Sequence, residues 1–142
     1  MIYQLTEPTA VRGIITMIAK RPEAFEVPID VISKYIINSI DDPFSLILLD
    51  EVDGDVRGFA YISIEEFNGE DVAFIHSCIV EPSQKNTVYE FIARTKKWAR
   101  TKNVKKLVCV EDARIKAFMR KYKFKNMGTI LGLDLNEETD NE

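Results

Sequence analysis

The chain has 142 residues, of which 46% are apolar and 30% charged, and its formal net charge is −4. These values are ordinary for one globular domain with a sizeable core. No apolar run approaches the roughly 20 residues of a membrane-spanning helix, which excludes such a span and leads us to expect no membrane partner.

The sequence predicts a cytoplasmic protein with free thiols. Its first residues, MIYQLTEP, contain neither the basic nor the apolar region of a signal peptide. Cys78 and Cys109 both lie in apolar, strand-like runs, where buried thiols in a reducing compartment are expected. A disulfide between them would depend on geometry. One histidine and two separated cysteines do not form a metal site, so we expect no metal.

The first 80 residues predict a strand, two helices and an antiparallel meander. Apolar periodicity places the strand at 2–5, the helices at 10–20 and 29–40, and the meander strands at 44–51, 56–67 and 71–80. Asp53-Gly54 and Asn68-Gly69 are hairpin signals between those strands. The strand at 44–51 is apolar on both faces, so we expect it to be covered on both sides.

The second half predicts two helix–strand units. A long helix over 86–102 carries a single apolar stripe, made of Val88, Phe91, Ile92, Thr95, Trp98 and Ala99. A strand at 106–110, a helix at 112–122 and a last strand at 125–134, with a break near Gly128, follow. We therefore expect an α/β (α+β) fold with a mixed, mostly antiparallel central sheet and helices on both faces. Residues 1–135 form its single domain, and the acidic tail 136–142 is expected to be disordered.

This order of elements resembles the GNAT N-acetyltransferase superfamily. Three segments carry the resemblance in letters: CIVEP at 78–82, Trp98-Ala99-Arg100, and DARIKAFMRKYKF at 112–124. The resemblance implies an N-acetyltransferase fold that uses acetyl-CoA or CoA and acts on an amine of a small molecule or a peptide.

The resemblance also implies a pyrophosphate-binding loop after the strand at 71–80. The family has Gln/Arg-x-x-Gly-x-Gly/Ala there, so that loop N–H groups and a helix N-terminus hold phosphate. Here Asn86 and Val88 occupy the glycine positions, and the branched Val88 predicts weak CoA binding. The CoA-contacting residues implied are Cys78, Ile79, Val80, Gln84, Lys85, Asn86, Thr87 and Val88.

Few residues are candidates for catalysis. The tyrosine that often serves the family as general acid corresponds to Met119, and Tyr122 could replace it or simply pack in the core. His76, the one histidine, could be a general base, because imidazole titrates near neutral pH. The alternative is a hydrogen-bonded core histidine.

Charge is distributed unevenly. The segment 94–125 holds 13 of the 19 basic residues and two of the 23 acidic ones. It predicts an anionic ligand, an acidic protein partner or self-association, unless these lysines and arginines only solvate outer helix faces. Acidic residues around the second hairpin could attract a cationic amine or form a solvated turn; they are Glu65, Glu66, Glu70 and Asp71.

Two functional hypotheses remain open. The first is an acyl-CoA-dependent N-acetyltransferase with a degenerate CoA loop and an unknown acceptor amine. The second is a catalytically inactive structural or protein-binding module of the same fold, for which a phage origin is a hypothesis. Nucleic-acid binding is not expected, because the aromatic residues between 94 and 125 are spaced for core packing rather than base stacking.

Overall fold

A computed structural model describes residues 1–20, 29–84, 86–110, 125–126 and 130–135. Within these ranges seven strands form one sheet, in the order β1-β2-β3-β4-β5-β7-β6. The strands are β1 Ile2–Gln4, β2 Ser45–Val52, β3 Asp55–Phe67, β4 Glu70–Val80, β5 Lys106–Val110, β6 Lys125–Asn126 and β7 Ile130–Asp134. The described helices are α1 Val11–Ala19, after a 3-10 turn at Pro8–Ala10, α2 Ile29–Ser39 and α3 Thr87–Thr101.

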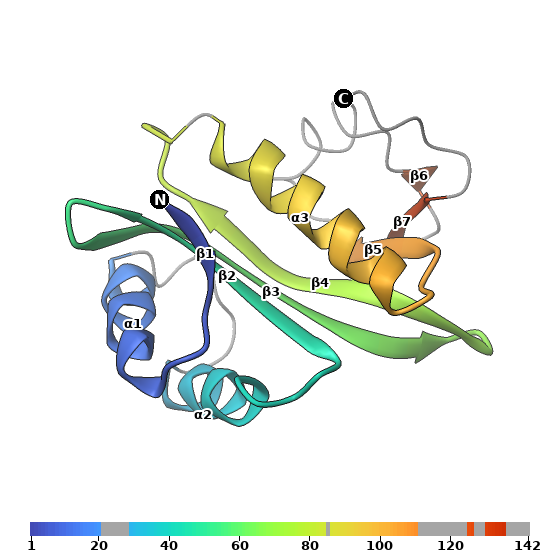
Figure 1. Ribbon diagram of the computed structural model, residues 1–142, viewed down its shortest axis with the longest axis horizontal. Helices are drawn as coiled ribbons and strands as arrows, with labels where there is room; N and C mark the ends of the chain where they lie inside the picture. The colour runs from blue at the N-terminus through green and yellow to red at the C-terminus, as the bar shows by residue number, and fades with distance from the viewer. Residues whose placement is uncertain (21–28, 85, 111–124, 127–129, 136–142) are drawn as a thin grey trace.

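Helices cover both faces of the sheet. Helix α3 lies across one face, and α1 and α2 lie on the other (Figure 1). Strand β2 is the reason that both faces need cover, since Leu46 and Leu48 enter the core under α3 while Ile47 and Leu49 enter the core under α1 and α2. The expected fold class, α+β with helices on both faces of a mostly antiparallel sheet, is confirmed.

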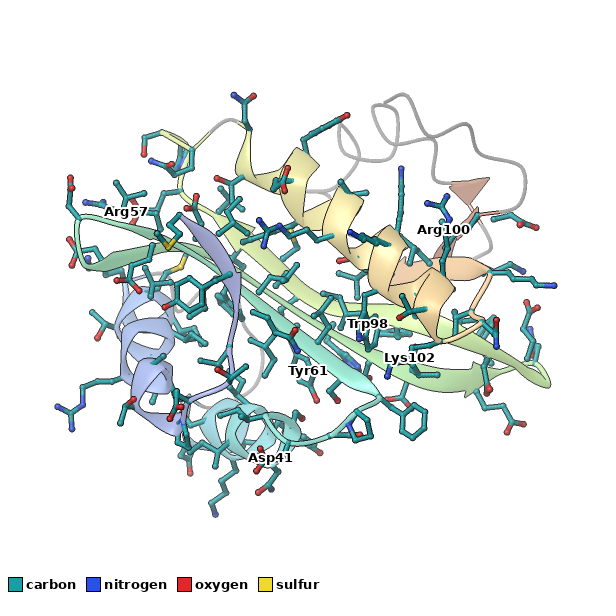
Figure 2. The ribbon with its side chains drawn as sticks, viewed as in Figure 1. Asp41, Arg57, Tyr61, Trp98, Arg100 and Lys102 are labelled. Carbon is teal, nitrogen blue, oxygen red and sulfur yellow. The ribbon has the colours of Figure 1, made fainter. Side chains whose placement is uncertain are left out.

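Helix α3 packs through the predicted stripe. Phe91, Ile92 and Ala99 are buried against the sheet, whereas Val88 and Trp98 are partly buried at the margin of the same core. Thr95 is also buried. Its hydroxyl can leave water without an energetic penalty because it donates to the Phe91 carbonyl oxygen at 2.7 Å. Figure 2 shows Trp98 on the sheet side of α3.

The sheet is antiparallel except where β4 pairs with β5. That pair is parallel because α3 carries the chain back across the sheet between the two strands. Both predicted hairpins form, and Asp53, Gly54, Asn68 and Gly69 all have positive φ, as two-residue turns of this kind require.

The prediction of one last strand over 125–134 is wrong. Strands β6 and β7 are separate and antiparallel to each other, and β7 pairs with β5. The break expected near Gly128 falls between these two strands. That break, the helix predicted at 112–122 and the acidic tail lie outside the described residues.

Two further expectations concern the whole chain. Cys78 and Cys109 are free thiols, as predicted. No helix in the described ranges is long and apolar enough to cross a membrane. The cytoplasmic location stays a prediction.

Candidate functional site

Strands β4 and β5 separate halfway along β4. They pair only from Ala73 to Ile75 on β4, opposite Leu107 to Cys109 on β5. Strand β4 continues to Val80, and among the described residues no strand pairs with this edge of 76–80. Within the described part of the chain, the second half of β4 therefore has an open backbone edge, which makes it able to receive an extended ligand.

A β-bulge lies where the two strands separate. In the β3–β4 ladder Tyr61 pairs with Ser77 while Ile62 pairs with Ile75, so His76 is the extra residue. A bulge bends its strand and increases the local twist. The pairing of β4 with β5 ends at Ile75, directly before this bulge, and the one histidine of the chain stands at that point.

The alternation of hydrogen-bonded pairs in the β3–β4 ladder shows which backbone groups of β4 point toward the open edge. The Glu81 N–H donates to the Arg57 carbonyl oxygen at 2.9 Å, which continues the β3–β4 register as a hydrogen-bonded pair. Pairs in an antiparallel ladder alternate, so the pairs made by Val80 and Cys78 are the non-hydrogen-bonded ones. The N–H and C=O groups of Cys78 and Val80 consequently point away from β3, toward the open edge.

The thiol nearest this edge is a poor nucleophile. Burial, with a smaller contribution from Cys109, raises the pKa of the Cys78 thiol to about 12. The side chain packs against the core under α3. Cys78 is thus protonated at neutral pH and contributes to the edge through its backbone.

His76 lies on the face of the sheet that α1 and α2 cover. Its Nε2 is 2.6 Å from the Ser63 Oγ, which donates to the Glu65 Oε1 at 2.8 Å. Its ring stands 4.8 Å from the rings of both Tyr61 and Phe74, measured between centroids. The side chain is 34% exposed, so His76 is hydrogen-bonded, as one prediction had it, but it is not a fully buried core residue.

The surroundings of His76 favour the neutral imidazole. Burial lowers the pKa of His76 below its ordinary value of 6.5, and the nearby Glu65 carboxylate offsets part of that effect. At neutral pH the ring therefore has a nitrogen lone pair available to accept a proton.

A hydrogen bond ties the histidine's neighbour to helix α2. The Tyr61 hydroxyl lies 2.7 Å from the Ser39 Oγ, and Ser39 donates its only hydroxyl hydrogen to the Tyr35 carbonyl oxygen. Tyr61 must then be the donor to Ser39. Figure 2 shows Tyr61 on the side of the sheet toward α2, so the C-terminal turn of this helix fixes one wall beside His76.

Two backbone N–H groups of the loop between β4 and α3 are hydrogen-bonded to carbonyl oxygens nearby in the chain. The Gln84 N–H donates to the Glu81 carbonyl oxygen at 2.9 Å, and the Thr87 N–H donates to the Gln84 carbonyl oxygen at 3.3 Å. Asn86 has a right-handed conformation with φ −94°, not the left-handed one available to glycine. Lys85 lies outside the described residues.

Val88 does not project into this loop. It is partly buried and packs against the core under α3, because the helix turns its side chain toward the sheet. The steric objection to phosphate that the sequence suggested at Val88 is therefore not supported by its position. The loop amides that are already hydrogen-bonded remain a reason to expect weak CoA binding.

The start of α3 is anchored by a contact that the sequence did not predict. The Thr87 hydroxyl donates to the Asp50 carboxylate, which is buried on strand β2. Gly58 makes the approach possible, since a Cβ there would lie 3.3 Å from the Thr87 Cγ2. In the sequence, the only indication that Asp50 has a structural role is its position directly after the apolar run Leu46 to Leu49.

The predicted basic face is only partly on the surface. Arg94 and Lys97 are exposed on α3, and Arg94 pairs with Glu90 at 3.0 Å. Lys96 is only 2% exposed, so the prediction that it belongs to this face is wrong: its position falls on the buried side of α3, between Ile92 and Ala99. Residues 111–124 of the predicted face, Tyr122 among them, lie outside the described residues.

The acidic residues of the β3–β4 hairpin are exposed at its tip. Glu70 pairs with Lys106 at 2.8 Å, and Glu65 accepts from Ser63. Nothing among the described residues gathers three potential metal ligands.

Comparisons with known proteins place the fold. No protein-family model and no curated protein matches the sequence. A GNAT-family protein from Desulfovibrio desulfuricans superposes with a TM-score of 0.78 at 11% identity, over 95% of this chain and 98% of that one. A predicted acetyltransferase with acetyl-CoA from Clostridium acetobutylicum gives 0.75 at 16% identity, over 97% and 99%.

A third solved structure has a stated substrate class. The aminoglycoside antibiotic 6'-N-acetyltransferase from Acinetobacter baumannii gives a TM-score of 0.74 at 18% identity, over 90% of this chain and 92% of that one. Identities this low establish the fold alone. The chain has the GNAT acetyltransferase fold, and the resemblance that the element order suggested is confirmed at that level.

Proposed function

We propose that this protein is an acyl-CoA-dependent N-acyltransferase that acetylates an amine of a small molecule or a peptide. The observation that carries the proposal is the open edge of β4 beside a neutral histidine at the bulge. A similar fold in a solved structure with acetyl-CoA and in an aminoglycoside N-acetyltransferase supports it.

The open edge suits an acyl-CoA. The arm of CoA contains amide groups that can pair with a strand edge, and the outward N–H groups of Cys78 and Val80 are placed to donate to it. A backbone N–H aimed at a thioester carbonyl oxygen also stabilises the negative charge that forms there. The loop residues Gln84, Lys85 and Asn86 complete the proposed contact surface.

His76 serves as the general base in this proposal. An amine must lose a proton before its nitrogen can attack, and a neutral imidazole can take that proton. The bound thioester supplies the activated acyl group. Tyr122 is the candidate donor of the proton that the departing thiolate needs, with water as the other source.

A binding and turnover experiment tests the function. Acetyl-CoA should raise the thermal midpoint of the protein, because it binds only the folded state, and release of CoA thiol should then be measured with polyamine, aminoglycoside and peptide amines. His76→Ala should lower turnover by roughly 10²–10⁴-fold without changing the acetyl-CoA midpoint shift. No midpoint shift at millimolar acetyl-CoA would contradict the proposal.

The hydrogen-bonded loop amides favour a second candidate. Because the Gln84 and Thr87 N–H groups are engaged within the loop, the fold could act as a non-catalytic module that binds an acidic protein through the exposed residues of α3. Failure to bind acetyl-CoA, together with capture of an acidic protein, would favour this alternative.

A further inference from the structure

Three polar side chains form a row on one face of the sheet. Ser63 and Glu65 are two residues apart on β3 and so share a face, and the bulge brings His76 of β4 onto the same face. The His76 Nε2 lies 2.6 Å from the Ser63 Oγ, and the Ser63 Oγ lies 2.8 Å from the Glu65 Oε1. Ser63, the central residue of the row, is only 7% exposed, so its hydroxyl is shielded from water.

Counting hydrogens fixes the direction of both bonds. An ionised carboxylate only accepts, so Ser63 gives its one hydroxyl hydrogen to Glu65. The Ser63 oxygen can then only accept from His76, which must carry its hydrogen on Nε2. The other ring nitrogen, Nδ1, is left with its lone pair, and it makes no hydrogen bond to any residue in the described ranges.

We infer that Glu65, acting through Ser63, is a positioning residue that holds His76 in the Nε2–H tautomer and leaves Nδ1 as the proton-accepting atom. The catalytic meaning of this arrangement rests on the proposed function, whereas the tautomer itself does not. Ser63 is not a nucleophile here, because its hydrogen is committed to the carboxylate rather than to the imidazole.

Glu65 also supports the charged form of the ring. Among the described residues, the groups that contact His76 are Tyr61, Ser63 and Glu65 from β3 and Phe74 from β4. Glu65 is the carboxylate among them, with its Oε1 3.8 Å from the His76 Nε2. When His76 accepts a proton on Nδ1, the Nε2–H of the resulting imidazolium still donates to Ser63, and the Glu65 carboxylate stabilises the positive charge through space.

Nuclear magnetic resonance tests the tautomer directly. The chain has a single histidine, so the ring nitrogens of 15N-labelled protein need no assignment by mutation. The neutral ring should show a protonated Nε2 and an unprotonated Nδ1. A protonated Nδ1 in the neutral form would overturn the inference.

Variants test the role of the carboxylate and the hydroxyl. Glu65→Gln should lower the titration midpoint of His76, because the carboxylate raises the pKa of the ring, whereas Glu66→Gln, the adjacent exposed carboxylate, should leave it unchanged. Ser63→Ala should let the Nδ1–H tautomer appear, and Ser63→Thr, which keeps the hydroxyl, should suppress it again. Equal midpoints in the two glutamine variants, or a single tautomer in Ser63→Ala, would overturn the inference.

The same variants separate this inference from the proposed function. If the protein acetylates an amine, the acidic limb of its kcat/KM profile should move to lower pH in Glu65→Gln by the same amount as the resonance midpoint. If the resonance results hold and no acyl transfer is detected, the proposed function fails while the positioning of His76 stands.

Discussion

At the scale of single residues, the site depends on one histidine with two opposing influences. Burial disfavours its charged form and Glu65 favours it, with burial the stronger of the two. The bulge sets the position of His76, at which both influences act. This balance makes the imidazole a measurable contributor to stability as well as a candidate base.

The depressed pKa of His76 predicts an acid-sensitive stability. The unfolded chain binds a proton near pH 6.5, and the folded chain binds it only at lower pH, so the free energy of unfolding falls as pH decreases through 6.5. Chemical denaturation at pH 7 and pH 5 measures this loss. His76→Gln should lose less stability over that interval than the native protein, and an equal loss in both would contradict the pKa direction.

At the scale of elements, helix α3 is the piece whose placement decides the site. Its first turn is held by the Thr87–Asp50 hydrogen bond, and its middle by Phe91 and Ile92. The loop proposed to contact CoA ends at this first turn. Anything that shifts the helix start will therefore change the loop before it changes the core.

Removing the Thr87 hydroxyl should destabilise the fold. Thr87→Val keeps the shape but leaves the buried Asp50 carboxylate without that donor, at a cost of about 1–3 kcal/mol. Thr101→Val is the matched control, because the Thr101 hydroxyl donates to a carbonyl at the exposed end of the same helix. Urea denaturation of both variants compares them, and equal losses would show that the buried contact is not special.

The stripe of α3 predicts an order of core substitutions. Phe91→Ala should cost about 3–5 kcal/mol, because the side chain is fully buried. Trp98→Ala should cost less, since Trp98 is only partly buried at the margin of the core. Thermal denaturation ranks the two, and the reverse order would mean that Trp98 is buried more deeply than the structure has it.

At the scale of the whole molecule, the sequence was informative about elements and silent about their junctions. Hairpin signals and apolar periodicity located β2, β3, β4 and α3, because those features are local. In the sequence, alternate positions are occupied by Phe74, His76 and Cys78, which predicts that the three side chains share one face of the sheet. The structure instead puts Phe74, His76 and Tyr61 together and sends Cys78 to the other core.

The bulge and the Asp50 contact could not be predicted for the same reason. Each depends on a pairing between residues that are far apart in the sequence, and no local pattern encodes such a pairing. Asp50 and Thr87, for example, are 37 positions apart. The buried position of Lys96 was missed because a basic residue within a charged run was taken to be solvated.

Charge on the exposed side of α3 predicts salt-dependent binding, if an acidic partner is used. Polyglutamate is a suitable probe, and its affinity should fall steeply as salt increases. Lys97→Glu should weaken the binding, whereas Lys20→Glu, an exposed lysine just after α1, should not. If the affinity for polyglutamate changes neither with salt nor in Lys97→Glu, these residues are solvated surface and not a binding face.

The bulge also has a consequence for how this site can be lost. His76 is the one residue of β4 without a partner of its own on β3, so a chain lacking it could keep every other β3–β4 pair in register. Deleting the His76 codon should therefore give a folded protein with a regular ladder, in which β4 stays beside β5 and any acetyl-CoA binding of the native protein is lost. His76→Ala should still bind it. A single in-frame deletion would remove the opening and its base together, leaving an intact scaffold of the same fold.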